Sequence, residues 1–301
     1  MRILLFTGKG GSGTSTAAAA TAHSAAKRGH RTLLLVRPDD HASADLLGAP
    51  PDARPTFVAE QLAVARSSNL PGDVGAWDVV VVDGGPSATF LAWFERERGH
   101  EPDRSRADTL VARANEEATS WSVPSAREVL SDPTRTTARL VTTDSPLVLA
   151  DTRRTLVALS LVGCPVDTVL WRGNRSPEDH LPITSVPPVR VVPHHDPEPT
   201  GHDALRALGD DMWGNDDPTT VLVGHTPLRV GRVTDGYELA LDLPLVERDE
   251  LDLARSTNRL VVRVAGWERT VPLPDSLARR SVRQATLREG VLRVHFADPD
   301  R

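Results

Sequence analysis

The chain has 301 residues, a formal net charge of −6 and a pI near 5.9, and its hydrophobic content of 39% is ordinary for a globular protein. Its length predicts two domains, its single cysteine excludes an internal disulfide framework, and its mixture of 35 basic with 41 acidic residues argues against a nucleic-acid-binding surface. The sequence has no apolar run of ~18 residues and no signal-peptide pattern, so we expect a cytoplasmic protein without a transmembrane helix.

Short apolar runs alternate with helical patterns through the first half of the chain. Four consecutive valines at residues 79–82 are the clearest of these runs. Continuous apolar runs are typical of parallel strands that are covered on both faces. The alternation predicts a doubly wound, mostly parallel α/β sheet. The expected strands are residues 3–6, 32–36, 79–82, 138–142, 166–171 and 189–192, and the expected helices are residues 15–28 and 148–161.

Two segments depart from this alternation. Residues 88–135 are expected to form a short helical insertion, with one of its helices at residues 108–121. Residues 172–224 are rich in Pro, His and Asp, a composition that marks a domain boundary. We therefore expect a first domain at residues 1–205 and a linker at residues 206–224.

The last part of the chain changes to a period of two. Leucines alternate with other residues over residues 238–243, and residues 259–264 and 291–296 repeat this alternation. The pattern is typical of strands with one buried face, and no helical stretch separates these strands. Residues 225–297 are therefore predicted to form a small, all-β, antiparallel sandwich.

A glycine-rich loop lies between the first expected strand and the first expected helix. Lys9, one of only two lysines in the chain, lies in this loop. Successive backbone N–H groups without Cβ crowding can wrap a phosphate chain at a helix N-terminus. A hydroxyl in the first helical turn, here that of Ser15, can bind Mg²⁺. The candidate nucleotide-binding residues are Gly8, Lys9, Gly10, Gly11, Ser12, Gly13, Thr14, Ser15 and Thr16.

The loop resembles the deviant Walker A motif, G-K-G-G-x-G-K-[ST]-[ST], of the arsenite-pump (ArsA) and tail-anchored-protein-targeting ATPases. The resemblance implies a P-loop protein that dimerises and uses ATP and Mg²⁺. In this family the early lysine, here Lys9, reaches the nucleotide of the partner protomer. The later lysine binds the β- and γ-phosphates in its own protomer, and here it is Thr14. Because threonine carries no positive charge, we expect weaker nucleotide binding and hydrolysis slowed by about a hundredfold or more. A loop that no longer binds any ligand is the alternative.

Three more segments resemble motifs of this family, in the family's order. In the segment that resembles T-D-P-A-H-S-x-S-D, Pro38 replaces the aspartate that positions the attacking water, and Asp39 is the candidate to take over its role. Asp83 lies in a segment that resembles D-T-A-P-T-G-H, which implies that it binds Mg²⁺ through water beside Ser15. In residues 166–172, which resemble V-D-A-V-V-V-N, Arg172 replaces the asparagine that reads adenine. Its planar guanidinium can stack on a base but offers no hydrogen-bond acceptor.

Residues 225–297 resemble the α-crystallin-like (small heat-shock-protein-like) domain that some ArsA-type ATPases carry. In the targeting branch of the family, a Met-rich groove binds the transmembrane segment of a client protein. This chain has two methionines, neither of them in the insertion, so the insertion lacks the composition of such a groove. We favour a docking role for the β domain over independent holdase activity.

Histidine and cysteine offer weaker candidates for a site. His194, His195, His202 and His225 lie in the Pro-rich segment, where no helical or strand spacing fixes their geometry for a metal. We interpret them as solvated linker histidines. The single cysteine, Cys164, is interpreted as a small buried residue.

Three hypotheses about function follow from these residues. The first is a degenerate nucleotide-binding subunit with weak or absent hydrolysis, which dimerises with itself or with a related ArsA-type ATPase and offers Lys9 to that partner. The second is a slow Mg²⁺-dependent ATPase connected with ion transport or protein targeting, in which the resemblance implies catalytic roles for Lys9 and Asp39. The third is a chaperone-like scaffold whose β domain binds a protein client. We favour the first, and whether the chain is an enzyme stays open.

Overall fold

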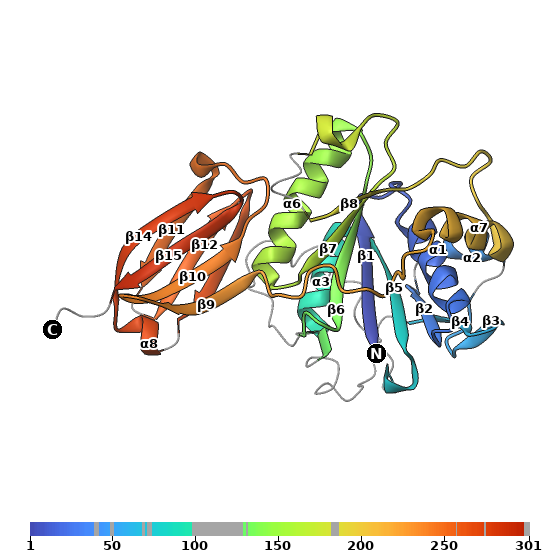
Figure 1. Ribbon diagram of the computed structural model, residues 1–301, viewed down its shortest axis with the longest axis horizontal. Helices are drawn as coiled ribbons and strands as arrows, with labels where there is room; N and C mark the ends of the chain where they lie inside the picture. Colours follow the sequence, from blue (N-terminus) through green and yellow to red (C-terminus); the bar gives the residue numbers. More distant parts are fainter. Residues whose placement is uncertain are drawn as a thin grey trace.

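The computed structural model shows an α/β domain followed by a β-sandwich (Figure 1), as the sequence predicts. The structure describes residues 1–38, 42–48, 51–67, 70, 74–97, 129–130, 132–181, 187–256, 258–273 and 275–297. Its helices are α1 (Thr14–Lys27), α2 (Ala42–Leu47), α3 (Ser87–Glu97), α6 (Pro146–Val162), α7 (Gly201–Trp213) and α8 (Asp275–Ala278). Its strands are β1 (Arg2–Gly8), β2 (Thr32–Val36), β3 (Thr56–Ala59), β4 (Leu62–Arg66), β5 (Val79–Pro86), β6 (Thr136–Thr142), β7 (Val166–Trp171), β8 (Val189–Val191), β9 (Leu228–Val233), β10 (Gly236–Asp242), β11 (Leu251–Ser256), β12 (Arg259–Val264), β13 (Trp267–Pro272), β14 (Ser281–Arg288) and β15 (Val291–Ala297).

Within the described residues, one eight-stranded sheet has the order β3-β4-β2-β5-β1-β6-β7-β8. All neighbouring strands are parallel except the edge pair of β3 and β4. This mostly parallel, doubly wound sheet confirms the predicted fold class. Strands β3 and β4 were not predicted, because β3 is exposed along its whole length and the buried part of β4 contains two small alanines.

Strand β1 shows why the central strands are apolar at consecutive positions. Ile3 and Leu5 pack in the layer with α3 and α6, whereas Leu4 and Phe6 pack in the layer with α1 and α7. Side chains along a strand alternate between the two faces of a sheet, so a strand covered on both faces is apolar throughout. Figure 1 shows α3 and α6 on one side of the sheet and α1 and α7 on the other.

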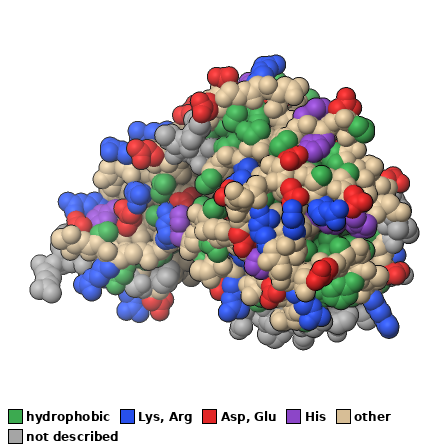
Figure 2. Space-filling view, turned by 45° about the vertical axis from the view of Figure 1, so that its right-hand side comes forward, with side chains coloured by type: hydrophobic (Ala, Val, Ile, Leu, Met, Phe, Trp, Pro, Cys, Tyr) green, Lys and Arg blue, Asp and Glu red, His purple; other side chains and the backbone are tan. Residues whose placement is uncertain are grey.

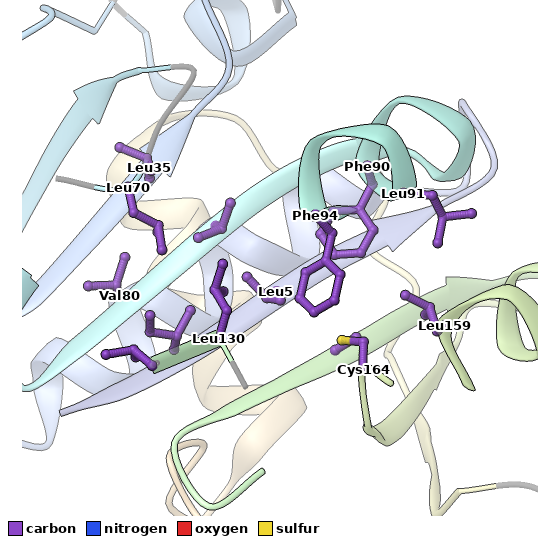
Figure 3. Packing of buried hydrophobic residues seen from close by; sticks show 14 of the residues in the cluster. Leu5, Leu35, Leu70, Val80, Phe90, Leu91, Phe94, Leu130, Leu159 and Cys164 are labelled. Atoms are coloured by element: carbon purple, nitrogen blue, oxygen red, sulfur yellow. The ribbon is translucent and has the colours of Figure 1, made fainter. Parts of the chain in front are cut away.

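Large side chains fill the layer between the sheet and α3 (Figure 3). Phe90 and Phe94 of α3 have ring centroids 5.9 Å apart and share this cluster with Leu5 of β1. Cys164, which follows α6, is fully buried in the same cluster, so it is the small buried residue that we expected. Helix α3 begins the predicted insertion, while the helix expected at residues 108–121 lies outside the described residues.

Helix α1 packs closely against α7 because both helices present small residues at their contact. A Cβ built on Gly209 of α7 would lie 2.4 Å from the carbonyl oxygen of Ala20 in α1. Trp213 Nε1 also donates a hydrogen bond of 3.1 Å to Thr21 Oγ1. Helix α7 therefore runs through the boundary expected at residue 205, and its second half is part of the α/β core. This packing favours a linker that begins after Trp213.

A buried ionic cluster fastens the segment after α7 to the sheet. Asp167 of β7 is fully buried and accepts hydrogen bonds from Arg2 at 2.9 Å and from Arg139 at 3.1 Å. Burial lowers the pKa of Arg2 to about 10, and the charge of Asp167 opposes that effect. Arg139 donates to the carbonyl of Pro218 at 2.6 Å, and Arg2 donates to that of Thr219 at 3.2 Å. The chain that leads to the second domain is thus anchored before it leaves the first.

Two antiparallel sheets form the second domain, with the orders β14-β15-β10-β9 and β11-β12-β13. Leu239 and Leu241 of β10, together with Leu243 directly after this strand, are buried between the sheets. The matching positions of β12 and β15 share this core, so the predicted period of two and the all-β sandwich are confirmed.

Helix α6 belongs to the cores of both domains. Its Leu156 and Leu159 pack in the α/β core, whereas Val157 and Leu161 pack in the core of the β-sandwich. Arg153 on the same helix pairs with Glu250, which precedes β11. Figure 1 shows α6 lying between the parallel sheet and the sandwich. The two domains are therefore joined through a shared apolar helix as well as through the chain.

The contact of α7 with α1 gives a prediction about stability. We expect Gly209→Ala to lower the free energy of unfolding by roughly 1–3 kcal/mol, because the new methyl group would force the Ala20 backbone to move. This range is net of the gain of about 1 kcal/mol that alanine brings to a helix interior. Urea denaturation compared with Gly231→Ala, where a Cβ would meet nothing within 4 Å, measures the effect. An unchanged or higher stability for Gly209→Ala would contradict the close packing.

The same helix pair gives a prediction about pH. Burial first, and then the neighbouring His202, whose Nδ1 lies 3.3 Å from His23 Nε2, lower the pKa of His23 to about 4 from its model-compound value of 6.5. Between pH 6.5 and 4 the unfolded chain therefore binds a proton at this residue that the folded chain excludes. The free energy of unfolding should fall by roughly 1 kcal/mol per pH unit as the pH decreases through this range.

Denaturation series at pH 7, 6 and 5 test this dependence on His23. We expect His23→Gln to flatten the decrease, since glutamine does not titrate, while His194→Gln at an exposed position leaves it unchanged. Equal slopes for the wild type and His23→Gln would contradict the assignment.

Candidate functional site

The glycine-rich loop lies at the carboxyl end of β1, between the ends of β5 and β6. Gly11 and Gly13 have φ angles of 82° and 89°, which side chains with a Cβ rarely adopt. Gly13 is the N-cap of α1, with no side-chain cap and no acidic residue in the first turn. The first N–H groups of α1 therefore present partial positive charge that no side chain of that turn offsets, which suits an anionic phosphate.

Gly8 is required by the close approach of the loop to β6. A Cβ on Gly8 would lie 2.5 Å from the carbonyl oxygen of Val141 and 2.7 Å from Ser12 Oγ. Gly10 and Gly11 are exposed at the tip of the loop, and a Cβ on either would meet nothing within 4 Å. The base of the loop is thus fixed by packing and its tip is open to a ligand.

The two lysine positions of the motif, residues 9 and 14, differ in their exposure to solvent. Lys9 is exposed at the start of the loop, and its carbonyl accepts a hydrogen bond from the Ser12 N–H at 3.0 Å. Thr14 is 7% exposed, and its Oγ1 lies 3.2 Å from Ser12 Oγ, within hydrogen-bond distance. Thr16, also predicted as a site residue, is buried on α1. The later lysine is therefore replaced by a short hydroxyl group that is turned into the base of the loop.

Ser15 and Asp83, the two expected Mg²⁺ ligands, lie on α1, which begins at the loop, and on β5, which ends beside it. Ser15 is half-buried in the first turn of α1. Asp83 is 2% exposed on β5, in register with Phe6 of β1, and its Oδ1 accepts a hydrogen bond from the Gly85 N–H at 3.2 Å. A hydroxyl and a carboxylate are hard oxygen donors, so these residues fit a Mg²⁺ ion that accompanies a nucleotide.

Two arginines flank the loop and the neighbouring end of β5. Arg172, directly after β7, donates from Nη1 to the carbonyl of Ser12 at 3.3 Å. Arg37, directly after β2, donates from Nη1 to the carbonyl of Gly84 at 3.4 Å. Arg172 was predicted as a site residue from the sequence, whereas Arg37 was not. The available signal was a basic residue immediately after a predicted parallel strand, at the sheet edge where ligands bind.

Comparisons with known proteins find matches in both domains of this chain. The family model "anion-transporting ATPase" matches residues 1–68, and the model "HSP20-like domain found in ArsA" matches residues 234–296. An uncharacterized protein of Streptomyces coelicolor, SCO2128, is 30% identical over 392 residues, which include 100% of this chain and 98% of that protein. This chain belongs to the ArsA-type ATPase family. A protein named "putative arsenical pump-driving ATPase" from Chlorobaculum tepidum is 24% identical, covering 98% of this chain and 96% of that protein.

The segment that follows β2, where the water-positioning aspartate is expected, is described only up to Pro38. Asp39, the candidate to position water, is among the residues that the structure does not describe, so its role stays a prediction. Pro38 is exposed after β2. Among the described residues, no helix has the length and apolar character that a membrane crossing requires.

The histidines do not form a metal site in the part of the chain that the structure describes, where no three His, Cys, Asp or Glu side chains gather. His194 and His225 are exposed, as we expected, whereas His195 and His202 are half-buried. His195 pairs with Asp211 and His225 with Asp242, each at 3.1 Å, and His202 lies on α7 against His23. The interpretation as linker histidines was therefore wrong for His202, which is part of a helix contact.

Proposed function

We propose that this chain is a nucleotide-binding subunit with weak or absent ATP hydrolysis, which pairs with a related ATPase in the cytoplasm and supplies Lys9 to that partner's nucleotide. The observation that carries the proposal is the contrast between the two lysine positions of the motif. Thr14 is buried against Ser12, whereas Lys9 is exposed on the loop. The group that would act in cis is absent, and the group that would act in trans is retained and accessible.

The loss of the cis lysine affects hydrolysis more than folding of the loop. Backbone N–H groups and positive φ angles shape the loop, and these do not depend on the side chain at Thr14. Hydrolysis, however, needs positive charge where negative charge develops in the transition state, and removal of one such group commonly costs about 10²–10³ in rate. A chain that binds Mg²⁺-ATP but turns it over slowly is the expected result.

The test is the turnover of a related ArsA-type ATPase that retains both lysines, measured with and without this chain. We expect the wild-type chain to raise that turnover, and Lys9→Ala to abolish at least nine-tenths of the increase. Lys27→Ala is the matched control, because Lys27 is the other lysine of the chain and pairs with Asp210 on the surface at 2.7 Å. Equal stimulation by the wild type and by Lys9→Ala would show the proposal to be wrong. The mass of the mixture in Mg²⁺-ATP reports the dimer directly.

A slow Mg²⁺-dependent ATPase is the second candidate, and the position of Asp83 favours it. The carboxylate is buried at the carboxyl end of β5 beside the loop, where the family's Mg²⁺-linked aspartate is expected. If this candidate is correct, homogeneous protein should hydrolyse ATP in Mg²⁺, and Asp83→Ala should reduce the rate at least tenfold through loss of metal binding. Turnover of the wild type that does not exceed the blank would exclude it.

A further inference from the structure

Arg172 lies in contact with the turn that begins α1. A Cβ built on Gly13 would be 1.6 Å from Arg172 Nη1 and 2.6 Å from its Cζ, so the guanidinium rests directly on the Gly13 backbone. Its Nη1 also donates to the neighbouring Ser12 carbonyl at 3.3 Å. The glycine at this position thus serves two purposes, because its φ of 89° forms the turn and its missing Cβ admits the guanidinium.

The charge balance around this contact is positive. The N-terminus of α1 carries partial positive charge, and its first turn holds no acidic residue. Of the carboxylates in the described residues, Glu198 is the one paired with Arg172, at 4.0 Å, and its side chain is 67% exposed. An exposed pair at that distance stabilises little. A guanidinium beside a helix N-terminus therefore gains most when an anion joins it.

We propose that Arg172 supplies, in cis, the positive charge that Thr14 cannot, and that it binds the phosphate groups of a nucleoside di- or triphosphate held by the loop. The proposal rests on the nucleotide-binding function above and changes the role expected for Arg172, from stacking on the base to pairing with phosphate. Arginine suits the role, because its planar group presents several N–H donors and one can hold Ser12 while others meet phosphate oxygens. The site thus retains nucleotide affinity although the motif lysine is lost.

Calorimetric titration of the full chain with Mg²⁺-ATP, Mg²⁺-ADP and inorganic tripolyphosphate tests the assignment. We expect Arg172→Gln to weaken the affinity for all three by about tenfold or more, and Arg172→Lys to retain most of it. Arg175→Gln is the matched control, since Arg175 lies three residues further along and its side chain is 70% exposed. Thermal unfolding of each variant verifies that it folds.

A second-site variant separates charge from other effects. In a Thr14→Lys chain the family's cis lysine is restored, so Arg172→Gln should there cost threefold or less, well below its cost in the wild-type chain. Equal costs in the two backgrounds, or weaker binding of ATP with unchanged binding of tripolyphosphate, would overturn the proposal in favour of a base-stacking role. Wild-type protein that binds none of the three ligands would overturn the nucleotide-binding function itself. Wild-type binding that Arg172→Gln leaves unchanged would overturn the role of Arg172 alone.

Discussion

The burial of α1 between the sheet and α7 is the constraint on which the site depends. All of its alanines are buried, and the contact with Gly209 leaves no room for one additional methyl group. A helix held this closely cannot shift along its axis without opening cavities or clashes, since interiors are close-packed. The first turn of α1 therefore stays at the carboxyl end of β1. The glycine-rich loop joins these two elements, so both of its ends are fixed. On the face shown in Figure 2, Lys and Arg side chains are interspersed with Asp and Glu side chains.

The anchoring of the linker and the position of α6 connect the site to the β-sandwich. Helix α6 starts after β6, the strand that Gly8 packs against, and its Thr152 donates to Thr142 Oγ1 at the end of that strand at 2.8 Å. Further along, Val157 and Leu161 enter the sandwich core. The clamp of Arg2 and Arg139 on the linker adds a second fixed connection. The β domain is therefore held by packing, which is consistent with docking to the nucleotide domain and unlike a freely tethered module.

Sequence patterns predicted the parts of the fold that depend on local periodicity. The apolar strands β1, β2, β5, β6 and β7 and the alternating strands of the sandwich were placed correctly because burial on two faces or one leaves a direct pattern in the residues. Strand β3 was missed because an exposed edge strand leaves no such pattern, and β4 was missed because two of its buried residues are small alanines. The domain boundary expected at residue 205 was inferred from composition, which contains no information about the tertiary contact that buries Leu208 and Met212. Within the site, the loop was predictable from its glycines, whereas the approach of Arg37 and Arg172 depends on long-range folding.

The replacement of one lysine therefore has to be judged against the whole charge distribution of the site. Thr14 removes a cation from α1, but the fold brings Arg172 to the same turn from a strand more than 150 residues later. In the proposed role, Arg172 meets the phosphates from the end of β7, whereas a lysine on α1 would meet them from the helix, and transition-state stabilisation depends on direction. Binding depends on direction less strictly, because a phosphate chain offers many acceptor oxygens to a multidentate donor. Under the two proposals above, this difference would account for a chain that binds nucleotide but hydrolyses it slowly, with Lys9 available to a partner.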